Sequence, residues 1–137
     1  MTAAPRWLLL FAAFAVRLLA ADAPPAKSST PPAGVQEITV VNSIDGVAEP
    51  VWYIPATSAQ PAPLLVHLHS WSARLGEASL AKECLKRGWA FLSPNFRGPN
   101  RRPEACGSRL AIQDVLDAVA YARRATAVDT RRIYLIG

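Results

Sequence analysis

The residues best suited to chemistry lie at 67–72, where two histidines and two serines follow an apolar run. His67 and His69 are two positions apart, and alternate side chains of a strand share a face, so the pair could begin a zinc site. The chain holds no third histidine, and no carboxylate is tied to the pair by its spacing. We therefore expect no metal and no cofactor, and we interpret both histidines as hydrogen-bonded structural residues.

A serine nucleophile needs a base within hydrogen-bond reach and a third group that orients the base. Ser70 and Ser72 are close to His69 in the sequence, but adjacency along the chain does not supply that geometry. No serine lies in the pattern Gly-x-Ser-x-Gly, which places a nucleophile on a sharp turn between a strand and a helix. We therefore name no catalytic nucleophile in this chain.

Three aspartates could be considered as a catalytic acid, and a local role explains each of them. Asp114 and Asp117 are expected on the polar face of a helix, where solvent satisfies them. Asp129 precedes Arg131 and Arg132 in a predicted turn, where its carboxylate would bond nearby backbone groups.

The elements that must position these residues follow from apolar spacing and turn signals. The last run, Ile133–Gly137, predicts a buried parallel strand that leads into a tight turn. The preceding elements are a hairpin of Glu37–Val41 and Val51–Ile54 around Asp45-Gly46, a strand at Leu64–His69, a helix at Gly76–Arg87 ending at Gly88, a strand at Trp89–Ser93, a loop at Pro94–Gly107, a helix at Ser108–Ala125 and a turn at Asp129–Arg132. This order predicts an α/β fold with a partial doubly wound sheet, a β-hairpin followed by βαβαβ.

The helix at 108–125 has the clearest amphipathic pattern, with Ser108 as a suitable N-cap. We predict an apolar face made by Ile112, Val115, Leu116 and Val119, and a polar face made by Gln113, Asp114, Asp117, Tyr121 and Arg124. The apolar face is expected to pack against the sheet.

Composition indicates a globular protein, because 51% of the 137 residues are hydrophobic and 18% are charged. The net charge of +5 comes from arginines scattered in pairs, without a basic stripe and interleaved aromatic residues, so we expect no nucleic-acid partner. Cys84 and Cys106 could form one disulfide. Cys84 lies on the apolar stripe of a predicted helix, and we interpret it as a small buried residue.

The N-terminus has the pattern of a secretory signal peptide. Arg6 precedes the apolar stretch Trp7–Val16, which is too short to span a bilayer, and small residues follow. An uncleaved anchor is the rival interpretation, and Arg17 argues against it. We expect a signal peptide at 1–21, a Pro/Ser-rich linker at 22–34, and a folded part at 35–137 of a secreted or periplasmic protein.

Taken in order, these segments resemble the catalytic domain of the prolyl oligopeptidase family of α/β-hydrolases. The resemblance rests on the hairpin, Pro63–Trp71 (PLLVHLHSW), Ser93–Gly98 (SPNFRG), the long amphipathic helix and Asp129–Gly137 (DTRRIYLIG). It covers the chain from Val35 onward. It implies the N-terminal part of a catalytic domain, truncated before the nucleophile elbow.

The resemblance implies an oxyanion-binding loop directly after the strand at 64–69, where the superfamily often has His-Gly-Gly. The backbone N–H groups of Ser70 and Trp71 are then the candidate donors to the oxyanion. Ser70 stands where the family usually has glycine, which allows closer approach of the backbone, but its amide can still donate.

The substrate cleft is implied at the carboxyl ends of the parallel strands, where open α/β sheets bind ligands. His69, Asn95 and Arg97 are the candidate residues that border it. Arg97 could instead pair with Glu104 or Asp114 and hold its loop in place.

The resemblance further implies a secreted serine hydrolase that forms an acyl-enzyme on a peptide or ester substrate, either a prolyl oligopeptidase-like peptidase or a carboxylesterase. The triad acid and histidine follow the nucleophile in this superfamily, so all three would lie beyond Gly137. No stable membrane anchor is expected after signal cleavage. Two alternatives stay open: an inert α/β remnant whose last strand is an exposed edge, and a different doubly wound enzyme with a Gly-rich loop after Gly137.

Overall fold

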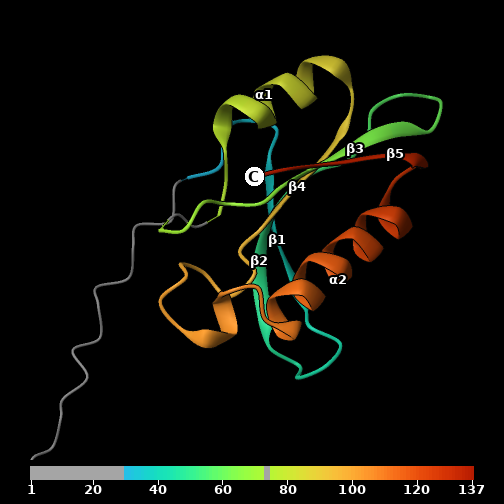
Figure 1. Ribbon diagram of the computed structural model, residues 1–137. Helices are drawn as coiled ribbons and strands as arrows, with labels where there is room; N and C mark the ends of the chain where they lie inside the picture. Colours follow the sequence, from blue (N-terminus) through green and yellow to red (C-terminus); the bar gives the residue numbers. More distant parts are fainter. Residues whose placement is uncertain (1–29, 73–74) are drawn as a thin grey trace, which may run out of the picture.

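The computed structural model describes residues 30–72 and 75–137. The predicted signal peptide and most of the predicted linker lie outside the described residues. The elements are β1 (Gln36–Val41), β2 (Ala48–Ile54), β3 (Ala62–His67), α1 (Ala78–Arg87), β4 (Ala90–Pro94), the short 3₁₀ helix η1 (Pro103–Ala105), α2 (Arg109–Ala125) and β5 (Val128–Ile136) (Figure 1).

The strands form one mixed five-stranded sheet in the order β1-β2-β4-β3-β5. β2 is antiparallel to both β1 and β4, whereas β3 is parallel to both β4 and β5. The chain passes over β3 on its way from β4 to β5, and α1 and α2 lie on opposite sides of the sheet (Figure 1). The predicted α/β fold, a hairpin followed by βαβαβ in a doubly wound sheet, is therefore confirmed.

Apolar side chains cover both faces of the sheet. β2 shows the alternation most clearly, because Val51 and Tyr53 belong to the cluster packed against α2, and Trp52 and Ile54 to the cluster packed against α1. The central strands are therefore buried on both sides, which explains their near-continuous apolar sequences.

The helix ends follow local signals in the sequence. Gly88 takes the left-handed conformation (φ 67°) at the end of α1, and the Ser108 hydroxyl accepts a hydrogen bond from the Ala111 N–H at the start of α2 (3.1 Å). Cys84 is buried in the α1-side cluster as expected, and burial raises the pKa of its thiol to about 11. Cys106 is exposed, and the two cysteines are not bonded to each other.

The predicted faces of α2 are confirmed only in part, because Val115 and Val119 pack against the α2-side cluster as expected, but the other two apolar residues do not. Ile112 and Leu116, expected in the core, are 54% and 53% exposed. The residues that α2 buries are Ala111, Asp114, Ala118 and Ala122. These four positions share one helical face, and the small alanine side chains let the helix lie close to the sheet. Ion pairing and hydrogen bonding, rather than solvent, satisfy Asp114 on this buried face, as described below.

Two strand boundaries also differ from the prediction. β3 ends at His67, so His69 lies in the following loop and the two histidines do not share a strand face. The segment Asp129–Arg132, expected to be a turn, belongs to β5, whose pairing with β3 is irregular between Ala62 and Leu64. Within this strand the Asp129 carboxylate accepts the expected local hydrogen bond from the Arg131 N–H (3.0 Å).

β5 is an edge strand of the sheet in the described part of the chain, so the strand predicted to be buried at Ile133–Gly137 is largely exposed. Tyr134, Leu135 and Ile136 are exposed along it, while Ile133 packs against the α2-side cluster. Across residues 30–72 and 75–137, no helix has the length and apolar character needed to cross a membrane.

Candidate active site

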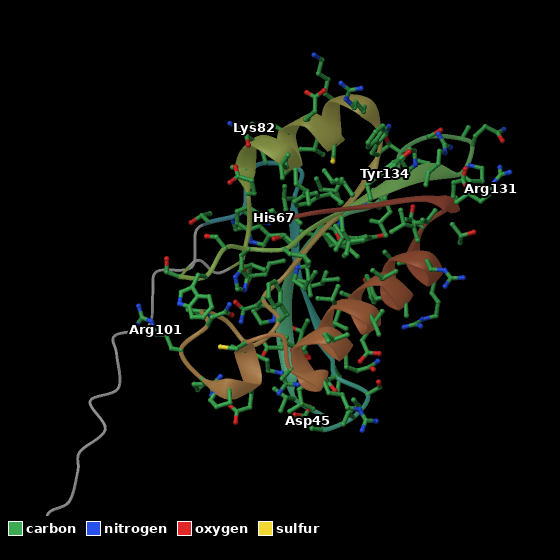
Figure 2. The ribbon with its side chains drawn as sticks, in the orientation of Figure 1. Asp45, His67, Lys82, Arg101, Arg131 and Tyr134 are labelled. Carbon is green, nitrogen blue, oxygen red and sulfur yellow. The ribbon has the colours of Figure 1, made fainter. Side chains whose placement is uncertain are left out.

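The carboxyl ends of β3, β4 and β5 meet at one end of the sheet. Figure 2 shows His67 toward this end and Arg131 at the opposite end of the parallel strands. The chain leaving β3 runs beside the end of β5, because the Leu68 N–H donates to the Ile136 carbonyl oxygen at 2.8 Å. Gly137 packs on the same segment, since a Cβ atom placed there would stand 3.2 Å from the Leu68 carbonyl oxygen. The loops after β3 and β4 and the end of β5 therefore lie together, at the edge where open α/β sheets bind ligands.

His69 connects the loop after β3 with the loop after β4. Its ring stacks on Phe96 with the centroids 3.9 Å apart, and its Nδ1 and Nε2 lie 3.0 and 2.8 Å from the carbonyl oxygens of Ser70 and Asn95. A carbonyl oxygen can only accept, so the imidazolium form makes both hydrogen bonds and either neutral tautomer makes one. The side chain is buried between the two loops, and both ring nitrogens face backbone acceptors.

That contact orients the peptide group between Ser70 and Trp71. The C=O and N–H of a trans peptide point in opposite directions, so the Ser70 carbonyl directed at His69 turns the Trp71 N–H away from the ring. The Trp71 carbonyl in turn accepts from the Asn100 N–H at 2.9 Å. Trp71 is 68% exposed, and among the described residues neither the Ser70 nor the Trp71 N–H has an acceptor. Ser70 and Trp71, whose N–H groups are the predicted donors, are thus exposed residues that follow the carboxyl end of β3.

The loop after β4 is a tight turn in an uncommon conformation. Phe96, Arg97 and Gly98 have φ values of 28°, 76° and 71°, which place three consecutive residues at positive φ. The Gly98 N–H closes the turn on the Asn95 carbonyl oxygen at 2.7 Å. The Asn95 amide donates to the Glu49 carboxylate in β2 at 2.8 Å, so this cleft candidate presents its backbone, not its side chain, to His69.

The side chain of Arg97, the third residue of this turn, has a structural role. Its Nε donates to the Asp114 carboxylate of α2 at 2.7 Å, and its Nη1 to the Asp45 carboxylate of the β1–β2 turn at 2.8 Å. These hydrogen bonds, that to Asp45 first, raise the pKa of Arg97 and lower that of Asp45. The sequence offered Glu104 and Asp114 as possible partners of Arg97. The pairing with Asp114 is confirmed, and the second partner is Asp45 instead of Glu104.

A hydrogen-bonded pair of serine and histidine side chains lies in the interior. The His67 Nδ1 is 2.9 Å from the Ser93 Oγ, and the same hydroxyl accepts from the Gly76 N–H at 3.0 Å. Ser93 is fully buried, so substrate cannot reach it, and burial lowers the pKa of His67. The pair fastens the segment before α1 to β4 and has a structural role. Within the described ranges, no cluster of three or more potential ligands from His, Cys, Asp and Glu could hold a metal.

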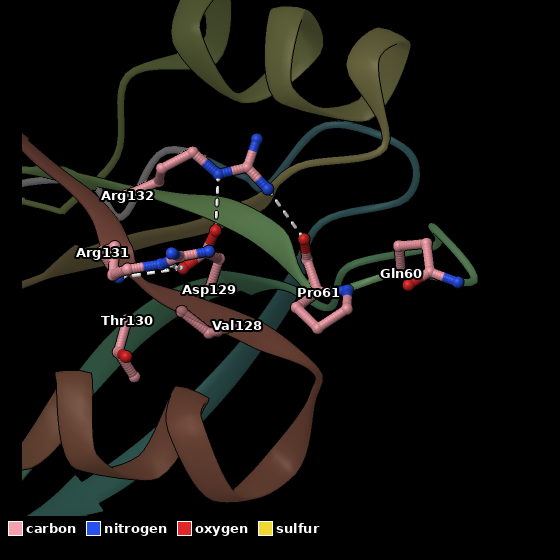
Figure 3. A pocket seen from close by; sticks show the side chains of 7 residues that line it. All are labelled: Gln60, Pro61, Val128, Asp129, Thr130, Arg131 and Arg132. Carbon is pink, nitrogen blue, oxygen red and sulfur yellow. Dashed lines mark hydrogen bonds and ion pairs between the residues drawn. The ribbon is translucent and has the colours of Figure 1, made fainter.

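A pocket of about 450 Å³ lies at the other end of the sheet, between the start of β5 and the loop before β3 (Figure 3). The Asp129 carboxylate accepts from the Arg132 Nε at 2.8 Å, and the Arg132 Nη2 donates to the Pro61 carbonyl oxygen at 2.9 Å. These groups satisfy one another, and the amino ends of parallel strands are not where such sheets place ligands. We therefore locate the candidate site at the carboxyl ends of the parallel strands, away from this pocket.

The fold of this chain is similar to that of several solved structures. The chain is similar to the acylaminoacyl peptidase of Pyrococcus horikoshii (21% identity, TM-score 0.58), with 74% of this chain matching 18% of that protein. It is similar to oligopeptidase B of Leishmania major (15% identity, TM-score 0.52; 74% of this chain, 16% of that one). It also matches a thermostable esterase (16% identity, TM-score 0.55; 74% of this chain, 33% of that one). No protein-family model and no curated protein sequence matches the chain.

The chain has an α/β-hydrolase fold. The resemblance to the prolyl oligopeptidase family is thereby confirmed at the level of the fold. The chain spans between 16% and 33% of the length of these three solved structures, so the activity of a whole hydrolase is a proposal for this chain.

The sequence indicated Asp114 as a possible partner of Arg97, although it also placed Asp114 on a solvated helix face. It did not indicate Asp45, which we interpreted as a turn residue, as a partner of Arg97, or Glu49 as a partner of Asn95. One signal for Asp114 is present in the sequence: Ala111, Ala118 and Asp114 share a helical face, and a stripe of small residues is typical of a helix lying close to a sheet. No local pattern indicates the contact of Arg97 with Asp45, because the two residues are separated by 52 positions.

Proposed function

We propose that this chain is the front part of the catalytic domain of a serine hydrolase that cleaves ester or peptide bonds through an acyl-enzyme. The orientation of the Ser70–Trp71 peptide carries the proposal. Its N–H is turned away from His69 and has no acceptor among the residues described, and Trp71 itself is an exposed residue. Acyl transfer requires such donors, fixed in advance, where the carbonyl oxygen of the substrate becomes negative.

The nucleophile is proposed to follow Gly137 on the turn that leaves β5. The end of β5 is hydrogen-bonded to Leu68, directly before the proposed donor loop, so a serine placed shortly after Gly137 would stand close to the Trp71 N–H. Its Oγ would attack the substrate carbonyl carbon and pass its proton to a histidine further along the chain. The oxyanion formed would accept from the Trp71 N–H, with the N–H after the nucleophile or that of Ser70 as a second donor.

The substrate class is proposed from the chemistry and from the similar proteins together. Two of those proteins are peptidases and one is an esterase, and both reactions pass through the same acyl-enzyme. The proposal therefore includes peptide and ester substrates. Export to a secreted or periplasmic location is proposed from the signal-like sequence at 1–21.

The proposal is tested with a fluorophosphonate probe and p-nitrophenyl acetate on the full-length protein, followed by mass spectrometry of the labelled peptide. We expect labelling of one serine two positions after Gly137, and no labelling of a 137-residue product. Labelling at Ser70 or Ser72 would contradict the proposal.

The donor role of the loop is tested by a matched pair of substitutions in the full-length protein. Trp71→Pro removes the N–H and is expected to lower kcat about 10²- to 10³-fold. Trp71→Ala keeps the N–H and is expected to retain most of kcat. Equal losses in the two variants would show that the indole, and not the amide, matters.

A further inference from the structure

Arg97 is the most heavily engaged side chain of the candidate site. Its side chain is 6% exposed, and its three nitrogens make four hydrogen bonds to two carboxylates. Nε and Nη2 bind Asp114 at 2.7 and 3.1 Å, and Nη1 and Nη2 bind Asp45 at 2.8 and 3.0 Å. The two partners come from different elements, α2 and the β1–β2 turn, so the guanidinium fixes its own loop relative to both.

The backbone around Arg97 needs such support. Phe96 and Arg97 are non-glycine residues at positive φ, a conformation that costs free energy and persists when the surroundings over-determine it. The buried guanidinium is bound by a carboxylate on each of two sides, which fixes the position of the Arg97 side chain. The fixed side chain in turn holds the turn from Asn95 to Gly98 in place. Asn42 adds to the same cluster, because its amide donates to Asp114 and to the Leu110 carbonyl oxygen.

The turn that Arg97 holds presents two groups to His69. The Asn95 carbonyl oxygen lies 2.8 Å from the His69 Nε2, and the Phe96 ring stacks on the imidazole. The opposite ring nitrogen faces the Ser70 carbonyl, which sets the direction of the Trp71 N–H. A continuous series of contacts thus runs from Arg97 to the proposed oxyanion donor.

We infer that Arg97 is a positioning residue for the proposed hydrolase reaction: its pairing with Asp45 and Asp114 holds the turn at 95–98 that orients His69 and, through it, the Trp71 N–H. The inference rests on the proposed function for its effect on turnover, but its effect on the loops does not depend on it. The β1–β2 hairpin, which lies outside the parallel part of the sheet, becomes a support of the active site through Asp45.

Arg97→Lys in the full-length protein tests the inference, because a single ammonium group cannot bind two carboxylates in two-pronged fashion. The control is Arg132→Lys, which changes another arginine–aspartate pair at the far end of the sheet. The first readout is the ring N–H signal of His69 in nitrogen-15 NMR, and the second is amide exchange of Asn100, whose N–H bonds the Trp71 carbonyl. If Arg97 only stabilised the fold away from these loops, its substitution would change neither the His69 signal nor the exchange of the Asn100 amide.

We expect Arg97→Lys to remove the His69 ring N–H signal, to speed Asn100 exchange about tenfold, and to lower kcat about 10²-fold with KM changed little. Arg132→Lys should leave all three unchanged. If Arg97→Lys does not fold, Asp45→Ala, which keeps the pair with Asp114, should give the same changes at smaller size. Retention of the His69 signal and of Asn100 protection in the folded variants would overturn the inference. Changed loop signals in a protein that lacks hydrolase activity would support the positioning role and refute the proposed function.

Discussion

An arginine paired with aspartate stands at each end of the parallel strands, and the two pairs differ in burial. At the carboxyl end the Arg97 side chain is 6% exposed and binds two carboxylates, one of them on the buried face of α2. At the amino end the Arg132 side chain is 46% exposed and binds Asp129. The same residue types therefore support a rigid loop at one end and an ordinary surface contact at the other.

The two ends of the sheet also differ in the shape of the surface and in the polar groups that they present. The amino end has a pocket of about 450 Å³, but its charged groups satisfy one another (Figure 3). At the carboxyl end, the Ser70 and Trp71 N–H groups have no acceptor among the described residues, and His69 fixes the orientation of the Ser70–Trp71 peptide. A preorganised donor is what acyl transfer requires, and the shape of the surface alone does not indicate it.

The largest difference between the two ends is expected from Arg97→Met. The substitution leaves Asp114 buried without its cation, which typically costs about 3–5 kcal/mol in the free energy of unfolding. Urea unfolding followed by tryptophan fluorescence measures the loss. A loss below about 1 kcal/mol would place this pair in the same class as surface pairs and remove the distinction.

Ser93→Ala should have the next largest effect. It leaves the Gly76 N–H and the His67 ring without their common partner in the interior, at an expected cost of about 1–3 kcal/mol. Ser58→Ala, at the opposite end of the sheet, is the control, because its hydroxyl accepts a single exposed hydrogen bond from the Gln60 N–H. Similar losses in thermal unfolding for the two variants would argue against a tightly held interior at the carboxyl end.

Arg132→Met should destabilise the protein by less than about 1 kcal/mol, since it removes an exposed pair in high dielectric. The midpoint of urea unfolding is the measurement. A loss as large as that of Arg97→Met would mean that the amino end also depends on its ion pair.

The smallest expected effect is a change in the acid limb of stability for Asp45→Asn. Arg97 lowers the pKa of Asp45 below 3.8 in the folded protein, so the stabilisation is present above about pH 4 and is lost as the pH falls through the folded pKa. The variant should therefore lose less stability than the wild type between about pH 4 and pH 2. Parallel curves of unfolding free energy against pH would contradict the role given to Asp45.

Local sequence signals correctly predicted where the helices begin and end and where the hairpin turns. Gly88 ends α1, Ser108 caps α2, and Asp45-Gly46 forms the hairpin turn, because each conformation depends on a few neighbouring residues. The buried face of α2 was predicted only in part: Val115 and Val119 pack against the core, but hydrophobicity also favours Ile112 and Leu116, which are exposed. The buried face is set instead by close approach of alanines to the sheet and by a charge whose partner comes from another loop.

The position of the candidate site in the sheet could be predicted from the sequence, but the contacts between its residues could not. The carboxyl ends of parallel strands converge in any such sheet, so His69, Ser70, Trp71 and Asn95 could be expected near one another. The pairing of His69 with Asn95 joins residues 26 positions apart through a turn at positive φ. No sequence period encodes that contact, since it depends on Arg97 and its two distant partners.

The most direct test of the account is a crystal structure of the full-length protein carrying a phosphonate adduct, in which the phosphonyl oxygen marks the position of the oxyanion. We predict that the phosphorus is bonded to a serine that follows Gly137, with the phosphonyl oxygen about 3 Å from the Trp71 amide nitrogen. An adduct whose oxygen points away from the Trp71 N–H, or one bound at the pocket lined by Asp129 and Arg132, would contradict the account.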